Sequence, residues 1–175
     1  FPGAAGLSRG AQHVDAPLPD HADLAIKAVE SPEGDSTSIG VDEQAVARCR
    51  KTAEQGVAEA QYTLGVMYDH GQGVPQDSAQ AVRWTRKAAE QGYAAAQALL
   101  GWFYRQGRGV RPDDVQFVAW SRKAAEQGHA LAQFTLGASY ALGRGVPQDY
   151  AQAATWYHKA AEQGDAQAQY SLGLF

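Results

Sequence analysis

The sequence predicts an all-α protein in which antiparallel helix pairs stack into a solenoid. The main observation is a phrase of 36 residues that recurs along most of the chain. The Leu-Gly pair of this phrase stands at residues 64–65, 100–101, 136–137 and 172–173. A fixed period of this length is typical of repeat architectures. Within each copy, apolar residues follow a helical spacing, and glycine-rich turns separate the helical stretches.

The repeat register divides the chain into an amino-terminal extension, residues 1–40, and a predicted solenoid, residues 41–175. We expect the extension to be largely irregular, because its Pro, Gly and Ser residues are scattered, with one short helix at 20–30 as an interpretation. The predicted solenoid comprises a half repeat at 41–57, full repeats at 58–93, 94–129 and 130–165, and a partial repeat at 166–175.

The first helix of each full unit is predicted from an apolar stripe. In the first unit, Ala58, Leu64 and Tyr68 follow helical spacing, and the later units repeat the pattern. Gly65 interrupts this stripe, although glycine costs about 1 kcal/mol in a helix relative to alanine. Its recurrence in every unit predicts a close approach of the partner helix, where a side chain would clash.

A turn and a second helix complete each unit. A Gly-x-Gly turn recurs in every full unit, at residues 71–73, 107–109 and 143–145, and allows the positive φ values of a tight reversal. The second helix is predicted to start near Asp77, Asp113 or Asp149, which can cap it. It ends on Lys-Ala-Ala-Glu-Gln-Gly, whose Gly92 suits the left-handed position after a helix. A single residue then leads into the next helix, so neighbouring helices must be antiparallel.

Composition and charge argue against several classes of function. The 175 residues carry a net charge of −4 and show no basic stripe, so we expect no nucleic-acid partner. No apolar run reaches the roughly 18–20 residues of a membrane span, so none is expected. The chain begins at Phe1, which predicts a periplasmic or secreted location if a signal peptide has been removed and a cytoplasmic one otherwise.

The repeat resembles the Sel-one-like repeat family, a relative of the tetratricopeptide repeats. The resemblance rests on the phrase A-x-x-x-L-G-x-x-Y-x-x-G-x-G-V-x-x-D-x-x-x-A-x-x-W-x-x-K-A-A-E-Q-G and covers residues 42–175. It implies a right-handed superhelix whose first helices line a concave face, and adaptors that hold proteins or peptides together. One branch of the family binds penicillin and carries a disulfide in each repeat, whereas Cys49 is the single cysteine of this chain.

Candidates for catalysis are few. The five histidines share no metal-ligand spacing, and no cysteine cluster accompanies them. Carboxylates that recur once per unit are explained by helix ends and caps. His129 is interpreted as a surface or capping residue. His158 is interpreted as one partner of a side-chain pair with Glu162, four residues later on the same helix. We therefore expect no catalytic residue, no metal site and no cofactor.

Residues that differ between copies are the candidates for partner contact. Under the geometry that the resemblance implies, the predicted contacts are Tyr62, Asp69, His70, Trp102, Arg105, Gln106 and Phe134. Trp102 is the most specific, because Val66 and Ala138 take its place in the other units. Aromatic and arginine side chains are favoured in interfaces. The alternative for the aromatic candidates is packing between repeats.

The sequence thus predicts a non-enzymatic scaffold that binds a partner protein or peptide in a concave groove. One alternative is a weak hydrolase or binder of β-lactams or cell-wall amides, by resemblance to the cysteine-rich branch. A structural spacer without a ligand in the groove is another. The oligomeric state is not predicted.

Overall fold

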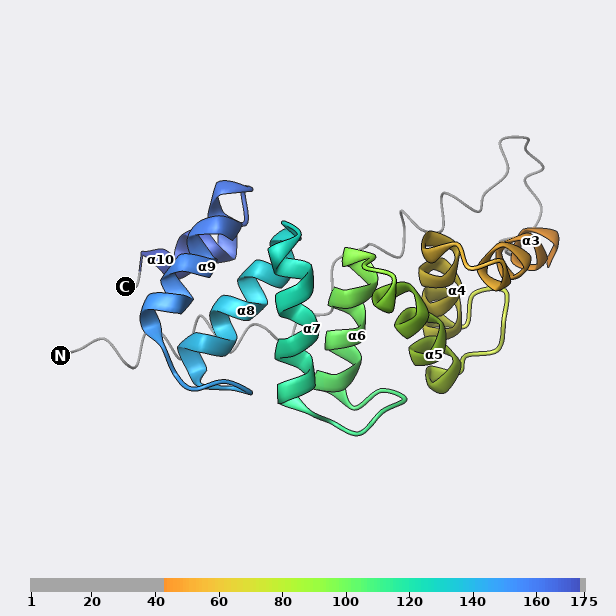
Figure 1. Cartoon of the computed structure of the whole chain (residues 1–175), viewed down its shortest axis with the longest axis horizontal. Coiled ribbons are helices and arrows are strands. Elements are labelled where there is room, and N and C mark those ends of the chain that lie inside the picture. Colours follow the sequence, from red (N-terminus) through yellow and green to blue (C-terminus); the bar gives the residue numbers. More distant parts are fainter. Residues whose placement is uncertain (1–42, 174–175) are drawn as a thin grey trace.

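The computed structural model describes residues 43–173, and every regular element in that range is an α-helix (Figure 1). The helices are α3 (Glu43–Glu54), α4 (Ala58–His70), α5 (Ser78–Glu90), α6 (Ala94–Gln106), α7 (Asp114–Glu126), α8 (Ala130–Leu142), α9 (Tyr150–Glu162) and α10 (Ala166–Leu172). The predicted all-α class is confirmed. The extension at 1–40, with the short helix expected at 20–30, lies outside the described residues.

The helices stack in chain order as an α-solenoid. The most extensive contacts lie within the pairs α4–α5, α6–α7 and α8–α9, followed by those between the second helix of one pair and the first helix of the next. At the two ends, α3 packs on α4 and α10 packs on α9. In Figure 1 the chain passes from α3 at one end of the stack to α10 at the other. This is the nearest-neighbour packing of a repeat protein.

Paired helices approach closely at the glycine of the Leu-Gly pair in each of the three full units. A Cβ atom on Gly65 would clash with the hydroxyl of Thr85 in α5 and would lie 3.1 Å from its backbone nitrogen. At Gly137 it would lie 2.8 Å from the ring of Tyr157 in α9. Contacts this short force the surroundings to move, so glycine is required here despite its low helix propensity. The predicted close approach is confirmed.

The turn of one unit rests on the start of the second helix of the unit before. Gly109 has φ 67°, and a side chain on it would strike the backbone carbonyl of Ser78. Gly145 has φ 70° and faces the carbonyl of Asp114 in the same way. The residue between the two turn glycines is therefore held in the same place at each junction. That residue is Arg108 at one junction and Arg144 at the next.

The predicted caps are present at the start of each second helix. The side chain of Asp77 accepts hydrogen bonds from the backbone N–H groups of Ala79 and Gln80, and Asp149 caps α9 in the same manner. Asp113 accepts from the N–H of Gln116. These bonds satisfy N–H groups that have no partner within the helix. The aspartates that recur in each unit therefore have a structural role.

A repeated glutamine network joins consecutive units. Gln97 donates to the carbonyl of Ala89, at the end of the preceding unit, over 3.1 Å. Its side-chain oxygen accepts a 2.7 Å bond from Gln127 at the end of its own unit. Gln61 and Gln133 make the corresponding contacts. Because Gln97 is buried, both of its amide atoms need partners, and the network supplies them.

Candidate partner-binding site

Two of the predicted aromatic contacts lie in the core. Tyr62 is 7% exposed and its ring centroid lies 5.4 Å from that of Tyr93, the last residue of the same unit and the N-cap of α6. Phe134 is 2% exposed and packs against Tyr157 at 5.5 Å. Burial raises the pKa of Tyr62 to about 12, with a further contribution from Tyr93. Both side chains fill the space between helices, which favours the packing alternative over partner contact.

Asp69 is also withdrawn from the surface. It is 3% exposed, and its Oδ1 lies 2.8 Å from Nη2 of Arg108 in the next unit. The same guanidinium donates to the backbone carbonyl of Asp69 at 3.3 Å. Burial raises the pKa of the Asp69 carboxyl, while the positive charges of Arg108 and His70 oppose that shift. Asp69 therefore joins two units, and its burial favours this structural role over the expected contact with a partner.

Trp102 lies partly exposed at the edge of the core formed by the first two full units. It packs edge-on against Phe103, and the guanidinium of Arg108 lies 5.5 Å above its ring. Its indole nitrogen is buried and has no hydrogen-bond partner among the described residues. The exposed part of the ring keeps Trp102 a candidate for partner contact.

His70 is exposed at the end of α4. Its Nδ1 lies 3.1 Å from the carbonyl of Val66 and 3.9 Å from Oδ2 of Asp69. The imidazole side chain is 47% exposed, so it is accessible from solvent. It occupies the position that Gln106 takes in the next unit.

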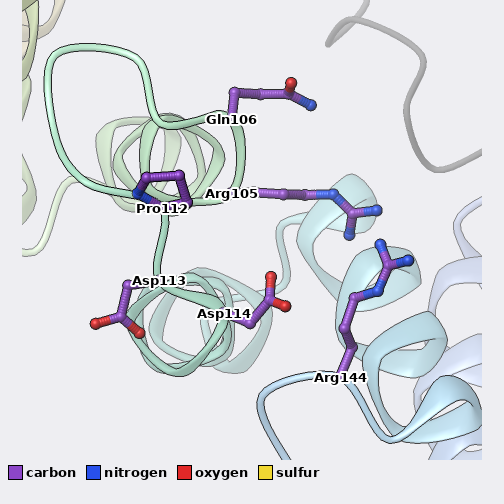
Figure 2. A pocket seen from close by; sticks show the side chains of 6 residues that line it. All are labelled: Arg105, Gln106, Pro112, Asp113, Asp114 and Arg144. Atoms are coloured by element: carbon purple, nitrogen blue, oxygen red, sulfur yellow. The ribbon is translucent and has the colours of Figure 1, made fainter.

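Arg105 and Gln106 line an open cavity of about 320 Å³ between the second and third full units (Figure 2). The other lining residues are Pro112, Asp113, Asp114 and Arg144. They come from the end of α6, the start of α7 and the turn after α8. The guanidinium of Arg105 lies 5.1 Å from the ring centroid of Phe117. Figure 2 shows Arg105 and Arg144 extending into the same space.

Sequence reasoning missed Arg144, because it took candidates for partner contact from the first helices alone and interpreted the Gly-x-Gly segments as turns. The signal that could have found it is the middle residue of the Gly-x-Gly turn, which reads Gln72, Arg108 and Arg144 in successive units. Two of these three residues are arginines that reach back toward the first helix of the preceding unit.

The other polar residues singled out from the sequence have local partners. The ring nitrogen of His129 accepts from the N–H of Ala132 and caps α8, and His158 lies 3.3 Å from Glu162. The thiol of Cys49 contacts the carbonyl of Ala60, and burial raises its pKa. Within 43–173, no group of three or more His, Cys, Asp or Glu is placed to hold a metal ion.

None of the helices between residues 43 and 173 combines the length and apolarity that crossing a bilayer requires.

The sequence model of the Sel1 repeat family matches three consecutive segments of the chain, residues 58–93, 94–129 and 130–165. The chain belongs to the Sel1 repeat family. A Sel1 repeat protein from Oxalobacter formigenes is similar, with 39% identity, a TM-score of 0.71, and coverage of 75% of this chain and 99% of that one. A protective antigen of uropathogenic Escherichia coli with an SLR fold is 38% identical, with a TM-score of 0.77. That match covers 97% of this chain and 35% of the antigen.

A more distant similarity links this Sel1 repeat chain to cysteine-rich protein B of Helicobacter pylori. The identity is 21% and the TM-score 0.59, over 77% of this chain and 97% of that one, so the likeness concerns the fold alone. Among curated proteins, no sequence match is found.

Proposed function

We propose that this Sel1 repeat chain is a scaffold that binds a partner protein or an extended peptide along the exposed ends of its first helices. The observation that carries the proposal is the open cavity at the end of α6, into which the predicted contact residues Arg105 and Gln106 project. Arginine is enriched among the residues that dominate interface energies, and the cavity gives it a recessed position.

Two consecutive first helices offer matching contact groups. His70 is exposed at the end of α4, and Gln106 is exposed at the end of α6, one repeat further on. Trp102, partly exposed and beneath the guanidinium of Arg108, lies one turn before Gln106. Because the repeat sets a regular spacing between these groups, an extended segment can be held at several points along the stack.

The proposal is for a non-enzymatic protein. Cysteine-rich protein B shares only the fold, so the hydrolase alternative rests on resemblance alone. A chromogenic β-lactam assay on the purified chain separates the two functions, because a scaffold gives no turnover above background. Turnover that follows the protein through successive purification steps would establish the hydrolase instead.

Site-specific photo-crosslinking tests the binding surface. p-Benzoylphenylalanine is placed at position 106, beside the cavity, or at position 83, where Arg83 is exposed on the second helix α5. Both positions are exposed, so neither substitution disturbs the core. In cells that express the protein natively, we expect crosslinks to a discrete protein at position 106 and not at 83. Equal crosslinking at both positions, or none at 106, contradicts the proposed surface.

A further inference from the structure

Two junctions between units differ in charge at matching positions. At the first junction, Asp69 of α4 pairs with Arg108 of the following turn, 39 residues later. At the second junction, the matching positions hold Arg105 and Arg144. The carboxylate of the first junction is therefore replaced by a second guanidinium.

The backbone that carries the two pairs is the same. The glycines on either side of Arg108 have φ of 67° and 67°, and those on either side of Arg144 have φ of 65° and 70°. Gly109 and Gly145 each rest on the backbone carbonyl at the start of the preceding second helix. Since the frame is shared, Arg144 projects toward Arg105 as Arg108 projects toward Asp69, and Figure 2 shows the two guanidiniums converging.

We propose that the cavity between Arg105 and Arg144 binds a carboxylate side chain from an acidic segment of the partner. This inference rests on the proposed function and specifies the chemistry of its ligand. A guanidinium presents a planar fork of N–H donors that matches a carboxylate, often with two parallel hydrogen bonds. The ligand carboxylate takes the place that the Asp69 carboxylate occupies one junction earlier.

The donors of Arg144 are available for this contact. Its guanidinium makes no hydrogen bond or ion pair with any residue between 43 and 173. The guanidinium of Arg105 packs over the ring of Phe117, 5.1 Å from its centroid, and this contact restricts its motion. A held guanidinium loses less conformational freedom when a ligand binds, which favours affinity.

Two carboxylates also line the cavity, and they act differently. Asp113 caps α7 through the N–H of Gln116, and its carboxylate turns away from the arginines in Figure 2. Asp114 points toward them and opposes an incoming carboxylate. Asp114 thus lowers the affinity of the cavity for an anion. Its removal should therefore strengthen binding, whereas removal of either arginine should weaken it.

The probe is a fluorescein-labelled hexaglutamate peptide, with hexaglutamine as the uncharged control, and binding to the full chain is followed by fluorescence anisotropy. Arg105→Asp recreates the Asp–Arg pair of the first junction, and Arg144→Gln removes one donor set. Both are expected to weaken hexaglutamate binding at least tenfold. Asp114→Asn is expected to strengthen it several-fold. Arg83→Gln, at an exposed arginine outside the cavity, is the matched control and should leave binding unchanged.

Fold integrity of every variant is checked by circular dichroism and thermal melting, which should show the helical content and cooperative melting of the unmodified chain. Hexaglutamate affinities within twofold for the unmodified chain and Arg144→Gln overturn the proposal, as does an equal loss in Arg83→Gln. Crosslinking at position 106 together with affinity insensitive to Arg105 and Arg144 leaves the scaffold in place and removes the acidic ligand. Affinity that depends on these arginines without any crosslinked partner supports the anion site and contradicts the scaffold.

Discussion

The carboxylate of Asp69 lies 2.8 Å from the guanidinium of Arg108, although the two residues belong to different repeats. Asp69 is almost fully buried, whereas about a third of the Arg108 side chain is exposed. The pair is therefore asymmetric. Loss of the arginine leaves a buried charge, and loss of the carboxylate leaves a cation that water can reach.

This asymmetry predicts the order of two substitutions. Arg108→Gln should lower the free energy of unfolding by about 1–3 kcal/mol, because a buried carboxylate loses its partner. Asp69→Asn should cost about 1 kcal/mol or less, because solvent screens the remaining guanidinium. Urea denaturation of both variants measures the difference. A larger loss in Asp69→Asn would contradict the assignment.

The same pair predicts a pH dependence. The pKa of Asp69 is raised in the folded chain, so the folded state holds this proton more tightly than the unfolded state. Stability from this carboxyl is therefore fully present below its ordinary pKa of 3.8 and falls as the pH rises through the raised value. In Arg108→Gln the opposing charge is gone, so its deficit in melting temperature should be largest at neutral pH and shrink toward about pH 4.

Asp69→Asn is the control for this pH series. Adding Asp69→Asn to Arg108→Gln removes the titrating carboxyl. Relative to Asp69→Asn alone, the double variant should therefore show a deficit in melting temperature that does not change between about pH 4 and neutral pH. A deficit in the single variant that stays constant with pH would show that Asp69 is not its source.

Close helix contact predicts the effect of alanine at the Leu-Gly pairs. Gly65→Ala and Gly137→Ala should each destabilise the chain by about 1–3 kcal/mol, although alanine gains about 1 kcal/mol of helix propensity. Gly101→Ala should cost less, because its nearest contacts, to Phe117 and Ser121, are at 3.1 Å. Thermal melting gives the order. Adding Thr85→Ala to Gly65→Ala should restore part of the loss, since the Thr85 hydroxyl is the nearest clashing atom.

The glutamine network predicts a contrast between its buried and exposed members. Gln97→Leu should cost about 1–3 kcal/mol, because the carbonyl of Ala89 loses its donor and the side chain of Gln127 loses its acceptor. Gln127→Ala should cost less, since Gln127 is exposed and water replaces its bond. Chemical denaturation of both variants tests this. Equal losses would mean that the network acts only through packing.

Trp102 offers a test of how its ring is held. Its indole nitrogen has no hydrogen-bond partner among the described residues, so Trp102→Phe should change the free energy of unfolding by less than about 1 kcal/mol. Trp102→Ala should cost more, because the packing against Phe103 and the contact with Arg108 are lost. A large loss in Trp102→Phe would point to a partner for the indole N–H.

Most of the fold could be predicted because the residues that start, end and pack the helices recur in every repeat. The caps at Asp77, Asp113 and Asp149 and the close approach at Gly65 follow from local chemistry. The extent of burial could not be predicted in the same way. Tyr62 and Phe134 differ between units yet fill the core, because the helical stripe that packs between units is wider than the shared residues indicate.

Sequence comparison singled out only some of the residues that line the cavity, for a geometric reason. Comparing residues 36 apart shows which positions vary, and Arg105 and Gln106 are among them. The partner of a residue at a junction, however, lies 39 residues away, one period plus three. Arg105 and Arg144 therefore hold different positions within the 36-residue repeat, and an alignment of the repeats does not place them together. Only the folded chain brings these two positions side by side.

The nearest-neighbour packing of the helices also has a mechanical consequence. Each extensive contact between residues 43 and 173 joins helices that are adjacent along the chain, and none of these contacts links α3 to α10 directly. A force applied at the two ends of the stack therefore acts on every junction in series. We therefore expect small extensions to be shared among all junctions, and a greater load to unfold the stack one helix pair at a time.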